Sequence, residues 1–103
     1  MTDGGADGGL PSVWMQELTW QEVEGYLDAG PRERIVLVPI GSTEQHGPAG
    51  CAGVDTLVAI TICEDVAQRP GVLVAPPLWY GDSSHHAAFP STISLSPDTM
   101  IAV

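Results

Sequence analysis

The chain has 103 residues, of which 44% are hydrophobic and 16% are charged, and this composition indicates one small globular domain. Three arginines, no lysine and thirteen acidic residues give a formal net charge of −10 at pH 7, which argues against binding to nucleic acid or to an anionic membrane surface. No stretch approaches the roughly 18 uninterrupted apolar residues of a membrane span, and the N-terminus has no signal-peptide pattern, so we expect a cytoplasmic protein.

The first part of the chain predicts a tail, a helix and a strand. Residues 1–12, MTDGGADGGLPS, are rich in Gly, Asp and Ala, and we expect them to form a disordered tail. Thr19 and Glu22 have the spacing of a capping box, so a helix is predicted from this point to Gly30-Pro31. Residues 34–39 form an aliphatic run without polar alternation, which is typical of a strand covered on both faces.

The second part of the chain repeats the pattern. Asp55 could cap a second helix that ends at Arg69-Pro70-Gly71, and residues 72–75 form a second aliphatic strand. Strand, helix and strand at this spacing are typical of a βαβ unit with parallel strands. Ser96-Pro97-Asp98 carries the signals of a helix start. We therefore predict an α/β fold over residues 13–103, with a partial parallel sheet flanked by helices.

The loop after the first strand, PIGSTEQHGPAGCAGVDT, contains Glu44, His46 and Asp55. Residues i and i+2 of an extended segment point to the same side, so Glu44 and His46 can converge, and Asp55 can return to them at a helix N-terminus. Two carboxylates and an imidazole suit zinc, manganese or a similar divalent ion. On spacing alone, two exposed loop residues and a helix cap remain the simpler interpretation.

Two segments carry a more specific signal. VPIGSTEQHGP and PPLWYGDSSHHAAFPSTISL, with Asp55 between them, resemble the creatininase (creatinine amidohydrolase) family. The usual forms in that family are G-S-x-E-x-H-G-P-H-L-P and Y-G…H-x-x-F-P-G-T. The resemblance runs from about Leu18 to the last residue, and it corresponds to the N-terminal part of a creatininase-like domain. The branch that trims the mycofactocin precursor peptide is one possible match.

The resemblance implies a metal-dependent amidohydrolase that cleaves a cyclic or linear, non-standard amide bond with metal-activated water. It implies a site for two zinc or manganese ions, in which Asp55 bridges the metals and Glu44 and His46 are terminal ligands, one on each ion. His86 matches the histidine of the second motif, which implies a substrate contact; a loop histidine bonded to the backbone is the alternative. The substrate would be a small amide or a peptide, and the family implies a homo-oligomer.

The sequence also departs from the family pattern. Ala49-Gly50-Cys51 stands where the family has H-L-P, and Ser91 replaces a glycine at a position where we expect a strained positive φ. The later G-H-G-G-N-type motif, which supplies another metal-binding histidine, does not occur in these 103 residues. Two hypotheses follow: the N-terminal portion of a creatininase-type enzyme, or a truncated, non-catalytic relative that acts as a metal-binding or subunit-interaction module.

Two aromatic residues and one histidine complete the expectations. Trp79 and Tyr80 could line a pocket, although packing in the core explains them equally well. His85 is expected to be exposed.

Overall fold

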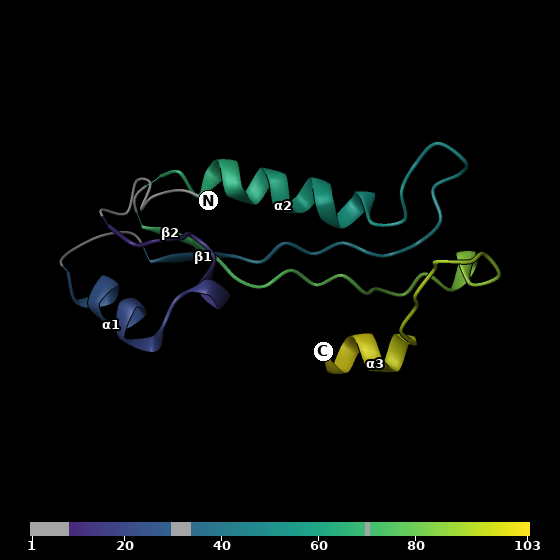
Figure 1. Cartoon of the computed structure of the whole chain (residues 1–103). Helices are drawn as coiled ribbons and strands as arrows, with labels where there is room; N and C mark the ends of the chain where they lie inside the picture. Colours follow the sequence, from purple (N-terminus) through teal and green to yellow (C-terminus); the bar gives the residue numbers. More distant parts are fainter. Residues whose placement is uncertain (1–8, 30–33, 70) are drawn as a thin grey trace. The chain divides into compact units, whose positions relative to one another are not determined.

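The computed structural model describes residues 9–29, 34–69 and 71–103. These residues divide into two compact units, Met1–Pro39 with Thr61–Pro76 (unit 1) and Ile40–Ile60 with Pro77–Val103 (unit 2). Figure 1 shows the elements in chain order: the 3-10 helix η2 (Met15–Glu17), α1 (Trp20–Asp28), β1 (Ile35–Leu37), α2 (Val54–Val66), β2 (Val72–Val74), the 3-10 helix η3 (Ser84–His86) and α3 (Pro97–Ala102).

Two helices begin where their capping residues predict. The Thr19 side chain accepts a hydrogen bond from the Glu22 backbone N–H, and the Glu22 carboxylate accepts one from the Thr19 N–H at 2.8 Å, so the predicted capping box of α1 is confirmed. The Ser96 hydroxyl accepts a hydrogen bond from the Thr99 N–H at 3.2 Å, ahead of the first turn of α3. The predicted end of the first helix at Gly30-Pro31 lies outside the described residues.

The two predicted strands form a parallel pair in unit 1. Ile35 lies opposite Val72 and Leu37 lies opposite Val74, with α2 between the strands in the sequence. The Val13 carbonyl also accepts a hydrogen bond from the Val74 N–H at 2.8 Å, so β2 has a neighbour on each edge. The predicted α/β fold with a partial parallel sheet is therefore confirmed.

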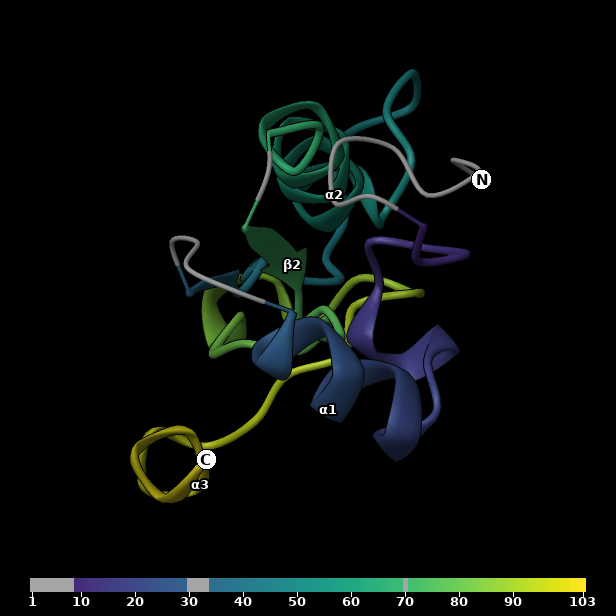
Figure 2. The same ribbon diagram turned by 90° about the vertical axis from the view of Figure 1, so that its left-hand side faces the viewer.

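The core of unit 1 lies on both faces of β2. Val72 and Val74 pack with Val13 and with Ala67, which follows α2. Leu73, on the opposite face by strand alternation, packs with Leu10 and with Tyr26 of α1. Figure 2 shows α1 beside β2. All three residues of β2 are buried, which explains why an aliphatic strand here shows no polar alternation.

Residues 34–39 were also predicted to form a strand that is buried on both faces, and that prediction is wrong for β1. Ile35 is 42% exposed and Val36 is 48% exposed in the described chain. The reason is the order of the neighbours: β2 lies between β1 and the segment at Val13, whereas β1 pairs with β2 alone among the described residues. An aliphatic run indicates a strand, but it does not indicate which strand is central.

The predicted tail, residues 1–12, lies largely outside the described residues. Of its last four residues, Leu10 and Ser12 are buried, and Leu10 belongs to the cluster around Leu73. The boundary at residue 12 stays a prediction.

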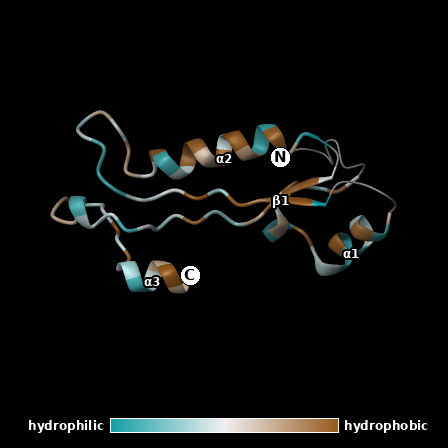
Figure 3. Cartoon of the chain, turned by 180° about the vertical axis from the view of Figure 1, so that it is seen from behind, coloured by the Kyte–Doolittle hydropathy of each residue, from teal (hydrophilic) through white to brown (hydrophobic). Residues whose placement is uncertain are grey.

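Helix α2 is apolar around much of its circumference. Leu57, Val58 and Ile62 are between 46% and 58% exposed, and Figure 3 shows apolar residues along the length of the helix. Asp55 lies inside its first turn, since the helix starts at Val54, so the prediction that Asp55 caps the helix is wrong. No helix among the described residues combines the length and the apolar character that crossing a bilayer requires.

Unit 2 is built from extended segments with few regular strands. The segments that begin at Ile40 and Pro77 run parallel at first, because the Gly41 N–H donates to the Leu78 carbonyl at 3.0 Å. A third segment returns beside them: the Ile93 N–H donates to the Thr43 carbonyl at 2.8 Å, and the Leu95 N–H donates to the Gly81 carbonyl at 2.8 Å. These bonds bring residues 41–46 beside residues 78–81 and 92–95.

A tight turn precedes the third segment. The Thr92 N–H donates to the Phe89 carbonyl at 3.3 Å, with Pro90 and Ser91 as the central residues. Ser91 has φ 70°, which together with Pro90 matches a type II turn, whose third position favours glycine. The expectation of a positive φ at Ser91 is therefore confirmed.

Replacing Ser91 with glycine is expected to raise the free energy of unfolding by roughly 1 kcal/mol, because a side chain in the left-handed region carries a steric cost that glycine avoids. The urea midpoint of S91G, at an unchanged m-value, measures the effect. Ser91→Ala is the matched control, since it keeps the Cβ atom and should gain nothing. Equal midpoints for S91G and S91A would contradict the assignment.

Candidate metal centre

Residues 42–46 are held in place by hydrogen bonds to the neighbouring segments. The Thr43 hydroxyl donates to the Trp79 carbonyl at 2.8 Å. The Gln45 backbone N–H donates to the Thr92 hydroxyl at 3.0 Å, two residues along the chain from Thr43 and its bond to Ile93. With Thr43 and Gln45 engaged by the neighbouring segments, Ser42, Glu44 and His46 are the residues that contact the start of α2 or lie near it.

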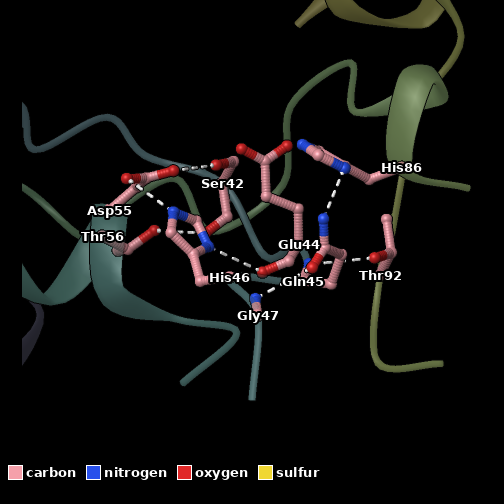
Figure 4. Close-up of polar contacts among 9 residues, drawn as sticks. All are labelled: Ser42, Glu44, Gln45, His46, Gly47, Asp55, Thr56, His86 and Thr92. Atoms are coloured by element: carbon pink, nitrogen blue, oxygen red, sulfur yellow. Dashed lines mark hydrogen bonds and ion pairs between the residues drawn. The ribbon is translucent and has the colours of Figure 1, made fainter. Parts of the chain in front are cut away.

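Glu44, His46 and Asp55 converge as the sequence predicts. One ligand atom from each lies within 4.8 Å of the other two. His46 Nε2 is 3.4 Å from Asp55 Oδ1, and the Ser42 hydroxyl donates to Asp55 Oδ2 at 2.8 Å (Figure 4). The sequence analysis did not identify Ser42, although it continues the i, i+2 pattern of Glu44 and His46.

Asp55 reaches this point because α2 starts directly against the loop. A Cβ atom on Gly41 would lie 2.2 Å from Thr56 Oγ1 and 2.5 Å from Thr56 Cα, so only glycine fits there. Thr56 is fully buried, and its hydroxyl donates to the Ser42 carbonyl at 3.2 Å. The first turn of α2 is thus fixed beside Ser42, which places the neighbouring Asp55 carboxylate near His46.

The hydrogen bonds of His46 leave its outer nitrogen for a ligand. His46 Nδ1 lies 3.0 Å from the Glu44 carbonyl oxygen, and a carbonyl can only accept, so we assign the hydrogen to Nδ1. The lone pair of neutral Nε2 then faces the Asp55 carboxylate. This arrangement is typical of metal-binding histidines, whose other ring N–H donates to a carbonyl or carboxylate.

The same contacts favour the protonated ring when no metal is bound. The hydrogen bond to the Glu44 carbonyl raises the pKa of His46 above its ordinary value of 6.5, partial desolvation lowers it, and the carboxylates of Asp55 and Glu44 raise it further. A cation at this point would replace the proton between His46 and Asp55. Two carboxylates and one imidazole form a donor set that suits zinc or manganese, so the residues present fit such an ion.

A second group shares Glu44. Ligand atoms of Glu44, His85 and His86 also lie within 4.8 Å of one another, and the two imidazole rings are 4.1 Å apart between centroids. His85 is exposed, as predicted. The imidazole ring of His86 is bonded to a side chain rather than to the backbone, because its Nδ1 is 2.8 Å from Gln45 Nε2. The sequence analysis missed Gln45, since nothing in its spacing connects it to His86.

An apolar pocket lies elsewhere in unit 2. Trp79 and Tyr80 contribute to its wall, in agreement with the first of the two interpretations given for them. Its lining residues are Pro77, Leu78, Trp79, Tyr80, Leu95 and Val103.

Comparison with known proteins connects these residues to a family. Residues 16–103 match the family model described as creatininase, creatinine amidohydrolase. The chain is 40% identical over 94 residues to a creatinine amidohydrolase from Pseudomonas putida, covering 86% of this chain and 35% of that protein. It is 34% identical over 90 residues to a 3-dehydro-scyllo-inosose hydrolase from Thermotoga maritima, covering 86% and 28%.

A peptidase is also among the relatives. The chain is 43% identical over 67 residues to the mycofactocin precursor peptide peptidase of Mycolicibacterium smegmatis, covering 59% of this chain and 27% of the peptidase. The resemblance to both the creatininase and the peptidase branch is therefore confirmed. This chain spans about a third of the length of the curated relatives it matches.

Solved structures agree with the fold. A manganese form of creatininase has a TM-score of 0.75 and a Zn–Zn form of a creatininase variant has 0.74. Each is 41% identical in sequence, and the match covers 85% of this chain and 35% of that structure's chain.

In the metal-free chain, His46 is expected to titrate above pH 6.5, because its protonated ring donates to the Glu44 carbonyl and faces Asp55. A pKa raised by folding means that this contribution to stability is fully present below pH 6.5 and is lost as the pH rises through the folded pKa. An NMR titration of the ring protons measures it. Asp55→Asn should lower the midpoint without removing the whole shift; a wild-type midpoint at or below 6.5 would contradict the geometry.

Gly41→Ala is expected to weaken zinc binding roughly 10- to 100-fold, because the new Cβ atom must displace Thr56 and with it Asp55. Competition with a chelator measures the affinity. Gly25→Ala is the matched control: a Cβ atom on Gly25 meets nothing within 4 Å, and in the helix interior it should add about 1 kcal/mol of stability. Unchanged zinc affinity in G41A would show that Asp55 does not depend on this close approach.

Proposed function

Because the chain belongs to the creatininase family, we propose that it is the N-terminal portion of a metal-dependent amidohydrolase that cleaves a cyclic or linear amide bond. The observation that supports this most directly is the convergence of Glu44, His46 and Asp55, with Nε2 of His46 facing Asp55. In this proposal zinc or manganese is the cofactor, as in the two solved structures, and the complete site holds two ions.

Each residue has a distinct role in the proposal. Asp55 bridges the two ions, and its two oxygens are already presented to different neighbours, Oδ1 to His46 and Oδ2 to the Ser42 hydroxyl. Glu44 and His46 are terminal ligands, one on each ion. His46 releases its Nε2 proton when a metal binds, whereas Nδ1 keeps its bond to the Glu44 carbonyl and so holds the ring in place.

Metal ions, when bound, polarise the amide carbonyl and lower the pKa of a bound water, so that hydroxide is available near neutral pH. The protein must then orient the amide. His86 is the residue that we assign to contact the substrate, since it lies within 4.8 Å of the ligand atom of Glu44. The substrate class is a small amide or a peptide. Assembly into a homo-oligomer and a cytoplasmic location stay predictions.

The alternative is a non-catalytic module that binds metal or another subunit. In this alternative Glu44, His46 and Asp55 hold a metal ion without hydrolysing an amide. Bound metal without hydrolysis of creatinine or of a mycofactocin precursor peptide would support this alternative.

The purified chain is expected to bind about one equivalent of zinc or manganese and to lose it in the triple variant E44Q/H46N/D55N, because the variant removes the charge or the imidazole of each donor. Elemental mass spectrometry measures the content. The control E24Q/D28N/H85N makes the same three kinds of change at exposed residues and should retain the metal. Metal retained by the first triple variant, or lost only in the control, would refute the assignment, provided that circular dichroism shows both proteins folded.

A further inference from the structure

The side-chain amide of Gln45 has a fixed orientation. Its Oε1 accepts a hydrogen bond from the Gly47 backbone N–H at 2.9 Å. The reversed amide would place the NH2 group against that N–H, so two donors would face each other. The backbone N–H of Gln45 is also held, because it donates to the Thr92 hydroxyl at 3.0 Å. The NH2 group of the Gln45 amide must therefore face His86 (Figure 4).

This orientation determines the tautomer of His86. Gln45 Nε2 is 2.8 Å from His86 Nδ1, and an amide NH2 group can only donate, so Nδ1 must accept. A neutral imidazole that accepts at Nδ1 carries its hydrogen on Nε2. Figure 4 shows this second nitrogen on the side of the ring toward the Glu44 carboxylate. His86 is thus the opposite tautomer of His46, which carries its hydrogen on Nδ1.

The contrast separates the two candidate ligand groups. His46 has a free Nε2 and a donated Nδ1–H, as metal-binding histidines have. His86 offers neither nitrogen to a metal, because Gln45 blocks Nδ1 and a hydrogen occupies Nε2. By distance alone the set of Glu44, His85 and His86 would qualify as a second metal site, but its hydrogen bonds disqualify it.

We infer that Gln45 is a positioning residue that holds His86 in the Nε2–H tautomer, so that His86 is a hydrogen-bond donor beside the metal centre and not a metal ligand. In the metal-free chain this N–H faces the Glu44 carboxylate. The inference deepens the proposed function and rests on it for one point, namely that the amide substrate accepts the hydrogen bond when a metal ion holds that carboxylate. The carbonyl oxygen of an amide gains negative charge as a nucleophile adds to the carbonyl carbon, before the C–N bond breaks, and a fixed N–H aimed at that oxygen stabilises the charge.

The test reads the tautomer directly in the metal-free chain. Long-range 1H–15N spectra distinguish protonated from unprotonated ring nitrogens, and the chain has only three histidines, which H46N and H85N assign. We expect hydrogen on Nε2 of neutral His86 and on Nδ1 of neutral His46. Hydrogen on Nδ1 of neutral His86 in the wild-type chain would overturn the inference.

Gln45→Glu is the matching variant, because it replaces the NH2 group by an oxygen of similar size that can only accept. His86 should then move its hydrogen to Nδ1, while the Gly47 N–H keeps its acceptor. Gln68→Glu, an exposed change of the same charge, should leave His86 unaltered. An unaltered His86 tautomer in folded Q45E would overturn the inference.

A zinc titration separates this inference from the proposed function. His86→Asn should bind as much zinc as the wild-type chain, since His86 is not a ligand. Loss of zinc in H86N alone would overturn the inference and leave the metal-dependent function standing. Absence of zinc from the wild-type chain would count against the proposed function, whereas the tautomer measured without metal would still decide the role of Gln45.

Discussion

The candidate metal centre depends on the alternation of side chains along one extended segment. Successive residues of an extended chain point to opposite sides, and here the side chains of Thr43 and Gln45 bind the neighbouring segments, at the Trp79 carbonyl and at His86. Ser42 and His46 contact Asp55 on the other side. A shift of one residue in this register would exchange the two sets and would direct Thr43 and Gln45 toward Asp55. The same register therefore fixes both the hydrogen bonds that hold this segment and the side chains that it presents to Asp55.

The same principle organises the core of unit 1. Val72 and Val74 serve one face of β2 and Leu73 serves the other, so three consecutive apolar residues are all buried by different partners. A strand with only one covered face would alternate with polar residues. In unit 2 the residues that alternate along 42–46 contact polar groups and not apolar side chains. The geometry of that segment therefore depends on directed hydrogen bonds. Such bonds fix orientation more narrowly than apolar packing does.

Local signals in the sequence predicted local structure correctly. The caps at Thr19 and Ser96 involve residues three apart, and the positive φ of Ser91 follows from a turn whose third position favours glycine. The prediction for β1 failed because the burial of a strand depends on segments far away in the sequence, here the pairing of β2 with Val13. The sequence placed the N-cap of α2 at Asp55, two positions too late, because a capping carboxylate and a carboxylate in the first turn look alike in sequence. In the site, the i, i+2 spacing predicted that Glu44 and His46 can converge, and the family resemblance selected them as ligands. The bond from Gln45 to His86 joins residues 41 apart and leaves no periodic signal.

The bonds that fix Ser42–His46 have a consequence for the order of events during synthesis. They join Thr43 and Gln45 to residues that lie 36 and 47 positions later in the chain. At about 5–20 residues per second, Thr92 is made roughly 2 to 9 s after Gln45. Throughout that interval the bond from Gln45 to Thr92 cannot form, because a distant contact must be closed before it can stabilise anything. The last of the bonds that hold residues 42–46 can therefore form only after both strands of unit 1 have been synthesised.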